Sequence, residues 1–165
     1  MNNLVLIGMP GCGKSTIGSL LSKRLNMDFI DMDDYIVKTE GKSVKEMFDI
    51  GENCFRDAET RCSMKLSQMN SIVISTGGGI IKRKENIDCF NKSSIIIFVN
   101  RPIEHILKDI DCEVRPLLAE GKTKLYNLYE ERICLYKKYC HIEINNSGNI
   151  YDTIEEIVKA IENFK

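Results

Sequence analysis

The sequence predicts an α/β fold in which a parallel sheet carries helices on both faces. Short apolar segments alternate with stretches in which apolar residues recur at helical spacing. Continuous apolar runs are typical of strands that are buried on both faces, as the strands of a parallel sheet are. A glycine-rich phosphate-binding motif follows the first of these runs and agrees with this class. The five predicted strands are 4–7, 29–31, 72–74, 95–99 and 142–144.

The first half of the chain is predicted to contain two of these strands and three helices. The strand 4–7 ends at Gly8, and the helix that follows has an apolar face formed by Ile17, Leu20, Leu21 and Leu25. Ser43 and Glu46 form a Ser-x-x-Glu capping box, which predicts a short helix that ends before Gly51. A longer helix is then indicated by a stripe of Phe55, Ala58, Cys62, Leu66 and Met69.

The second half is predicted to contain the other three strands. Strand 72–74 is stopped by the three glycines at 77–79. Pro102 opens the helix after strand 95–99, because proline is favoured in the first turn of a helix. A further helix has one face formed by Leu125, Leu128, Arg132 and Tyr136. Strand 142–144 precedes a closing amphipathic helix, whose apolar face is formed by Ile154, Ile157, Val158 and Ile161.

Length and composition predict one domain that spans 1–165. The chain has 165 residues, of which 43% are hydrophobic, so a core can form without a disulfide or a structural metal. A net charge of −1 argues against a nucleic-acid-coating role, and no apolar run approaches the roughly 18 residues of a membrane span. The least regular stretch, 109–121, is a candidate mobile lid. We expect a monomer with neither a nucleic-acid nor a membrane partner.

The cysteines and the first residues indicate a cytoplasmic protein. The seven cysteines are odd in number and no two have C-x-x-C spacing, so we expect reduced thiols and no zinc site. The segment 1–3 lacks the basic start of a signal peptide. Cys12 lies close to Lys14 at a predicted helix start, an environment that favours the thiolate. We hypothesise that Cys12 is reactive; the alternative is that its side chain packs into the protein interior.

Residues 8–15, Gly-Met-Pro-Gly-Cys-Gly-Lys-Ser, match the phosphate-loop pattern G-x-x-x-x-G-K-[ST] in full. The glycines allow backbone N–H groups to turn toward a phosphate chain, and the helix N-terminus adds partial positive charge. We expect Lys14 to reach the β- and γ-phosphates and the Ser15 hydroxyl to ligate Mg²⁺. The nucleotide is then expected to contact Gly11, Cys12, Gly13, Lys14, Ser15 and Thr16.

The phosphate loop alone does not choose between kinases, motors and switches. A GTPase should have an Asn-Lys-x-Asp guanine-binding segment after a strand, but Asn91-Lys92 here lacks the aspartate and precedes its strand. A motor ATPase usually needs a longer chain. A small-molecule or nucleotide kinase therefore fits best, and a non-catalytic nucleotide-binding switch is an alternative.

Polar residues at strand ends predict an acceptor site. Asp31 and Asp33 end the second strand and would share a face in an extended chain. One of the two carboxylates could hold Mg²⁺ through water, and the other could accept a proton from a hydroxyl. The alternative is that both only cap a helix. We expect Asp34, the next residue, to be a solvated helix cap. The glycines at 77–79 permit a ligand to approach backbone N–H groups closely, or form a flexible turn.

Two arginines are candidates for binding an anionic acceptor. Arg132 lies on an apolar helix face, and a buried cation needs an anionic partner, either a ligand or a structural salt bridge. Arg56 has Glu52 and Glu59 at helical spacing, so a surface ion pair is the alternative there. Two arginines and an aspartate would suit a small acceptor that carries a carboxylate and hydroxyls.

The chain resembles the shikimate kinase family from end to end. The matching segments, in order, are 8–16, 31–33, 51–59, 77–79, 115–118 and 132–136. The resemblance implies a three-layer P-loop kinase fold of the nucleoside-monophosphate-kinase type, with sheet order 2-3-1-4-5. It also implies ATP-dependent phosphorylation of the 3-hydroxyl of shikimate to shikimate 3-phosphate, a step toward chorismate and the aromatic amino acids.

The resemblance also implies roles for individual residues. Lys14, Asp33 and Arg115 would be catalytic: Asp33 contacts the reacting hydroxyl, and Arg115 enters from the lid, contacts the nucleotide and neutralises charge on the phosphoryl group. Ser15 would bind Mg²⁺ directly and Asp31 through water. Shikimate would be bound by Asp33, Arg56, Gly78, Gly79 and Arg132, and the acceptor-binding region is expected at about 33–60.

Three positions depart from the family pattern. Lys108 stands where an adenine-stacking arginine is common, and Cys134 stands where the family often has proline. Residues 147–149, Ser-Gly-Asn, lack the basic and proline residues that are often found in the adenine-side loop. The acceptor side shows no departure. Because gluconate also carries a carboxylate, a gluconate-type kinase of the same fold is the nearer alternative.

Overall fold

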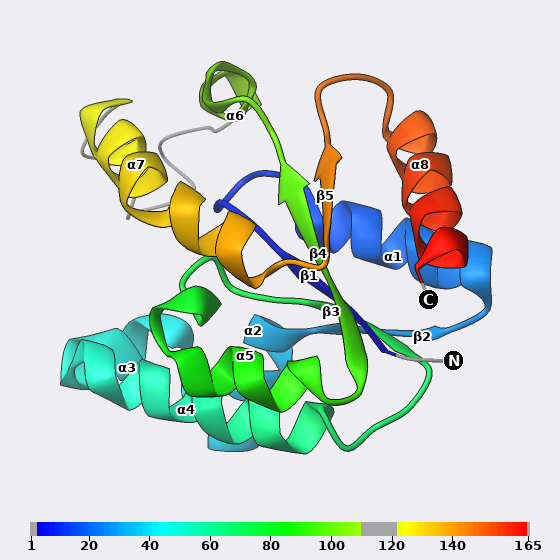
Figure 1. Ribbon diagram of the computed structural model, residues 1–165. Helices are drawn as coiled ribbons and strands as arrows, with labels where there is room; N and C mark the ends of the chain where they lie inside the picture. The colour runs from blue at the N-terminus through cyan, green and yellow to red at the C-terminus, as the bar shows by residue number, and fades with distance from the viewer. Residues whose placement is uncertain (1–2, 110–121, 165) are drawn as a thin grey trace.

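The computed structural model describes residues 3–109 and 122–164. At its centre is a five-stranded sheet in which all neighbouring strands are parallel (Figure 1). The strand order is β2-β3-β1-β4-β5, as the resemblance predicted. The strands are β1 (Asn3–Ile7), β2 (Asp28–Asp31), β3 (Ile72–Ser75), β4 (Ser94–Asn100) and β5 (Ile142–Asn145).

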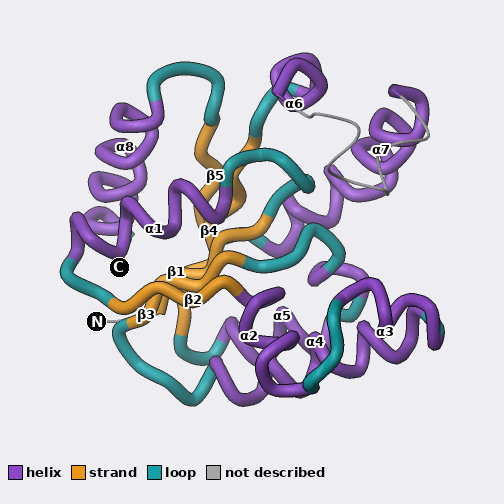
Figure 2. Tube along the Cα trace, turned by 180° about the vertical axis from the view of Figure 1, so that it is seen from behind, coloured by secondary structure: helices purple, strands orange, loops and turns teal. Residues whose placement is uncertain are grey.

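Helices cover both faces of the sheet and complete three layers. Helices α1 and α8 lie on one face, whereas α4, α5 and α7 lie on the other, and Figure 2 shows the same arrangement from behind. The helices are α1 (Lys14–Leu25), α2 (Met32–Glu40), α3 (Val44–Ile50), α4 (Glu52–Leu66), η1 (Ile80–Lys82), α5 (Lys84–Asn91), α6 (Ile103–Asp109), α7 (Lys122–Tyr139) and α8 (Ile150–Asn163).

The central strand, β1, places the phosphate loop at the middle of one sheet edge. Its segment Leu4–Ile7 is fully buried, because β3 and β4 flank it and helices cover both faces. In a parallel sheet, all the strand carboxyl ends meet at one edge, which is where ligands bind. The segments that follow β1, β2 and β3 therefore come together at that edge, although they are far apart in sequence.

The helix that follows β2 was missing from the sequence prediction, and the expected role of Asp34 was wrong. Helix α2 begins at Met32, immediately after the strand. Asp31 is its N-cap, because a carboxylate oxygen of Asp31 accepts a hydrogen bond from the backbone N–H of Asp33 at 3.1 Å. Asp34 therefore lies in the first turn of α2. The short elements η1 and α5 were also not predicted.

Helix α4 ends earlier than its apolar stripe suggested. Phe55, Ala58, Cys62 and Leu66 are buried as expected. Met69 was expected on the same face and is 40% exposed, because the helix ends at Leu66 and Met69 lies beyond it.

Three other expectations concern membrane spans, cysteines and the lid. In the segments 3–109 and 122–164, no helix combines the length and the apolar character needed to cross a membrane. Six cysteines in these segments are free thiols, and Cys112 lies outside them. The predicted lid, 109–121, lies outside the described residues apart from Asp109, which ends α6.

Candidate active site

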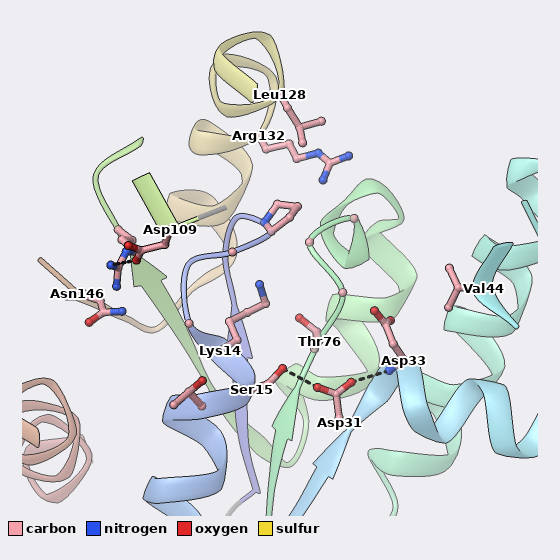
Figure 3. A pocket seen from close by; sticks show the side chains of 18 of the residues that line it. Lys14, Ser15, Asp31, Asp33, Val44, Thr76, Asp109, Leu128, Arg132 and Asn146 are labelled. Atoms are coloured by element: carbon pink, nitrogen blue, oxygen red, sulfur yellow. Dashed lines mark hydrogen bonds and ion pairs between the residues drawn. The ribbon is translucent and has the colours of Figure 1, made fainter. Parts of the chain in front are cut away.

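A cavity of about 880 Å³ opens at the carboxyl ends of the strands (Figure 3). The phosphate loop, the segment after β3, and helices α2, α3, α4 and α7 all contribute side chains or backbone to its wall. Eleven of the predicted site residues line it: Gly11, Gly13, Lys14, Ser15, Thr16, Asp31, Asp33, Arg56, Gly78, Gly79 and Arg132. Of the other two, Cys12 is buried in the phosphate loop and Arg115 lies outside the described residues.

The phosphate loop presents the start of α1 to the cavity. Gly13 is the N-cap of α1 and has φ +97°, a left-handed conformation that favours glycine. No side chain caps this helix start, so its first N–H groups are available to an anion. The Nζ of Lys14 donates hydrogen bonds to the carbonyl oxygens of Gly8 and Met9, each at 2.9 Å. The lysine charge is thus held over the loop that is expected to surround the phosphates.

The side chain of Cys12 faces the protein interior. It is fully buried, and its Sγ lies 3.7 Å from the Nζ of Lys14. Its backbone carbonyl accepts a hydrogen bond from Nδ2 of Asn146 at 2.9 Å. The structure therefore favours the alternative that the thiol packs inside, and leaves only the backbone of Cys12 for contact with a nucleotide.

Ser15, Asp31 and Asp33 form a connected polar group at the ends of β1 and β2. The hydroxyl of Ser15 donates to Oδ2 of Asp31 at 2.6 Å. The two aspartates do not share the face of an extended strand, as the sequence argument assumed, because Asp33 is already in the first turn of α2. Both nevertheless line the cavity, and Figure 3 shows the Asp33 carboxylate on the acceptor side of Asp31.

The carboxylate of Asp33 is held in an environment that favours its neutral form. Burial raises its pKa, and the negative charge of Asp31 raises it further, whereas Lys14 and Arg56 act in the opposite direction. Its Oδ1 has no hydrogen-bond partner among the described residues. A half-buried carboxylate with an unused, buried oxygen and a raised pKa is suited to receive a proton from a hydroxyl group in the cavity.

Arg56 is both a buried cation and a member of an ion-pair network. Its Nη1 lies 2.5 Å from Oε2 of Glu59, and its Nε lies 3.1 Å from Oε1 of Glu52. The expected alternative of a helix ion pair is therefore present, but the arginine is only 8% exposed and lines the cavity. A Cβ atom at Gly79 would collide with the guanidinium group, so any side chain there would displace Arg56 from its present position. Glu59, whose buried carboxylate also lines the cavity, was noted in the sequence only as a partner of Arg56.

Arg132 extends from α7 into the same cavity, from the side opposite Asp33 (Figure 3). It is 8% exposed, and its Nε is buried without a hydrogen-bond partner in the described part of the chain. No carboxylate of residues 3–109 or 122–164 lies within ion-pair distance of it, so these residues offer no structural salt bridge. A buried guanidinium without an anionic partner is suited to bind an anionic ligand.

A comparison with family models assigns residues 10–162 to the model for shikimate kinase. The chain belongs to the shikimate kinase family. It is 49% identical over 160 residues to the shikimate kinase of Clostridium beijerinckii, with 95% of each chain covered. It is 46% identical over 162 residues to that of Clostridium botulinum strain Alaska E43, with 98% of each covered.

Solved shikimate kinases have the same fold. The structure from Acinetobacter baumannii in complex with shikimate superposes with a TM-score of 0.91 at 30% identity, and covers 100% of this chain and 95% of its own. The structure from Aquifex aeolicus gives a TM-score of 0.83 at 32% identity, with 98% and 96% covered. The resemblance inferred from the motifs and the predicted P-loop kinase fold are both confirmed.

The part of the cavity beside the phosphate loop contains residues that the sequence argument did not select. Asn146 follows β5 and is 2% exposed; besides its bond to Cys12, its Oδ1 accepts from the hydroxyl of Thr153 at 3.3 Å. Arg101 follows β4, lines the cavity and pairs with Asp109. Asparagine and arginine at strand ends are common in any α/β protein, so the sequence contained no motif that would have singled them out.

Proposed function

We propose that this chain transfers the γ-phosphoryl group of ATP to the 3-hydroxyl of shikimate, giving shikimate 3-phosphate and ADP. Membership of the shikimate kinase family makes it a phosphotransferase of the shikimate pathway. The observation that supports the assignment of residues is that one cavity contains a phosphate loop, a carboxylate with a raised pKa and two buried arginines. Each of the three substrate features, phosphate chain, hydroxyl and carboxylate, has a matching group there.

The acceptor would bind between α7 and the segment after β3. Arg132 and Arg56 approach from different helices and would bind the shikimate carboxylate, each through a guanidinium group that matches its two oxygens. The backbone of Gly78 and Gly79 would lie against the ring, where a side chain on either glycine would meet Pro10 or Arg56. This orientation would direct a ring hydroxyl toward Asp33.

Asp33 would accept the hydroxyl proton as the bond to phosphorus forms. Its carboxylate is close to Asp31 and Lys14, so the proton would be received at the junction of the acceptor and phosphate sites. The Nζ of Lys14 would exchange its two carbonyl partners for phosphate oxygens and stabilise the charge that develops in transfer. Arg115 is proposed to add a second positive charge; it lies outside the described residues.

The oxygen groups beside the phosphate loop fit Mg²⁺. The hydroxyl of Ser15 and the carboxylate of Asp31 are hard oxygen ligands, and they already lie within 2.6 Å of each other. The described residues contain no cluster of three or more His, Cys, Asp or Glu arranged around a metal position, which agrees with an ion held mainly by phosphates and water. Bound there, Mg²⁺ would neutralise the β- and γ-phosphate oxygens. Ser15 would ligate the ion and Asp31 would orient a ligating water.

The decisive experiment is an ADP-release assay with several acceptors. Shikimate should support rapid release, whereas gluconate and nucleoside monophosphates should give only the background rate. Release with gluconate and not with shikimate would favour the gluconate-type kinase, and ATP binding without transfer to any acceptor would favour a switch. We further propose that residues 1–165 form one kinase domain, with an acceptor-binding region at about 33–60 that α7 and the segment after β3 complete, and that the enzyme is a cytoplasmic monomer.

A further inference from the structure

Tyr136 belongs to a segment that resembles the family, yet the reaction described above gives it no part. It lies on α7, one helical turn after Arg132 and on the same face. It is fully buried, and its hydroxyl donates a hydrogen bond to the carbonyl oxygen of Gly78 at 2.6 Å. This bond joins α7 to the glycine segment after β3, across 58 positions of sequence.

The ring of Tyr136 is held independently of its hydroxyl. It stacks on Phe98 of β4, with ring centroids 5.1 Å apart and an interplanar angle of 17°. Burial raises the pKa of the Tyr136 hydroxyl, although the positive charge of Arg132 acts in the opposite direction. The hydroxyl therefore stays protonated and can donate to Gly78 over the working pH range.

Gly78 is fixed on its other side by the phosphate loop. A Cβ atom on Gly78 would lie 2.7 Å from Cδ and 2.9 Å from Cγ of Pro10, so the backbone of Gly78 packs directly against that proline. The hydrogen bond to the carbonyl group of Gly78 therefore attaches α7 to a backbone segment that packs against the phosphate loop.

We propose that Tyr136 is a positioning residue for the acceptor, because its hydrogen bond to Gly78 sets the distance between the Arg132 guanidinium and the backbone of Gly78 and Gly79. Both groups line the same cavity, so the bond would fix the width of the space for the substrate carboxylate and ring. This inference rests on the proposed function, since it concerns the same acceptor. The alternative is a core tyrosine whose hydroxyl is only satisfied by the nearest carbonyl.

The test is Tyr136→Phe, which removes the hydroxyl and keeps the ring on Phe98. The dissociation constant for shikimate, measured by isothermal titration without nucleotide, should rise by about 2–10-fold, the effect of one hydrogen bond. The KM for ATP should stay at the wild-type value. Tyr139→Phe, one turn further along α7, is the matched control and should leave both constants unchanged. Reversible unfolding would raise the apparent dissociation constant by the inverse of the folded fraction, so thermal unfolding of each variant is measured in parallel to show that it is fully folded at the titration temperature.

A double-mutant cycle with Arg132→Lys tests whether Tyr136 acts through the arginine. If it does, Tyr136→Phe should have little further effect on shikimate binding once Arg132 is lysine, so the two effects should not multiply. The inference is overturned if Tyr136→Phe binds shikimate with the wild-type dissociation constant, or if its KM for ATP rises by the same factor. It is also overturned if the fold-changes of the two single variants multiply in the double variant. Failure of the proposed function is distinguishable, since the wild-type enzyme would then not phosphorylate shikimate at all.

Discussion

The Nη1 atom of Arg56 lies 2.5 Å from Oε2 of Glu59, and this ion pair is inside the protein, because Glu59 is 1% exposed. Burial raises the pKa of the Glu59 carboxyl, and the charge of Arg56 opposes that rise. Arg56 therefore compensates a buried negative charge, and it also lines the cavity, where we propose that it binds the acceptor. The same part of the cavity combines the half-buried carboxylate of Asp33 and the buried carboxylate of Glu59 with two buried arginines, Arg56 and Arg132.

Arg56→Met should destabilise the fold in a pH-dependent way. Without its cation, the Glu59 carboxylate stays buried and uncompensated, a change that lowers stability by about 3–5 kcal/mol. The pKa of Glu59 in the folded state would rise further above its unfolded value, so stability should be retained at low pH and lost as pH rises through that pKa. Thermal unfolding of the variant between pH 5 and pH 8 measures the effect.

Arg24→Met is the control for this prediction. Arg24 pairs with Glu155, but both side chains are about half exposed, at 53% and 50%. An exposed ion pair contributes little to stability, so this variant should unfold near the wild-type temperature at every pH. Equal behaviour of Arg24→Met and Arg56→Met would contradict the assignment of a buried charge pair.

Asp33→Asn should abolish most of the turnover and spare ATP binding. The amide keeps the shape of the carboxylate but cannot accept the proton, so kcat should fall by roughly 10²–10⁴-fold. In the wild-type enzyme, kcat should fall as pH decreases through the raised pKa of Asp33, and this acid limb should be absent from the residual activity of the variant. An equal loss of ATP affinity would place Asp33 on the metal and away from the acceptor.

The same variant should be more stable than the wild type at neutral pH. Because the pKa of Asp33 is raised on folding, the folded state binds the proton more tightly than the unfolded chain, and stability decreases as pH rises through that pKa. Asparagine removes this dependence, so the gain in melting temperature should be present at pH 7–8 and shrink toward pH 4. The measurement is made without nucleotide and acceptor, which would change the charges beside Asp33.

The sequence predicted the parts of the site that depend on spacing and missed those that depend on contacts between distant segments. The phosphate loop and the Arg132 face were predictable because a motif and a helical period fix them locally. The beginning of α2 was not, since the second strand is short and Asp31 could be read either as its last residue or as a helix cap. The pairing of Tyr136 with Gly78 depends on where α7 packs, and no local pattern contains that information.

Arg132→Lys should raise the KM for shikimate and leave the KM for ATP unchanged. Lysine keeps the charge but loses the paired donors that match a carboxylate. A charge-assisted hydrogen bond contributes about 1.5–3 kcal/mol, so affinity should fall by roughly 10–10²-fold. Steady-state kinetics with each substrate varied in turn separates the two constants. An Arg132→Lys enzyme with normal constants but a lower melting temperature would show that the arginine is structural.

Cys12 should react slowly with alkylating reagents, contrary to the hypothesis drawn from its place in the sequence. Its thiol is fully buried, whereas Cys134 on α7 is exposed. Peptide mapping after brief treatment with iodoacetamide should find Cys134 modified first, with activity retained. Rapid inactivation that MgATP prevents and that Cys12→Ser abolishes would restore the original hypothesis.

Asn146→Ala should weaken ATP binding selectively. The Nδ2 of Asn146 donates a hydrogen bond to the Cys12 carbonyl at 2.9 Å, so the amide supports the phosphate loop from the end of β5. Alanine leaves the Cys12 carbonyl without this donor and allows the loop to move before phosphate binds. One lost hydrogen bond changes affinity by about 2–10-fold, so the KM for ATP should rise by that factor.

The neighbouring residue Asn145 provides the control for this last variant, because it is exposed and lies on β5. Asn145→Ala should have wild-type constants for both substrates. The dissociation constant for shikimate without nucleotide should be unchanged in both variants, since the acceptor walls are formed by α4, α7 and the segment after β3. If Asn146→Ala weakened shikimate and ATP binding equally, Asn146 would be supporting the whole cavity. The prediction that its hydrogen bond to Cys12 affects ATP binding alone would then be wrong.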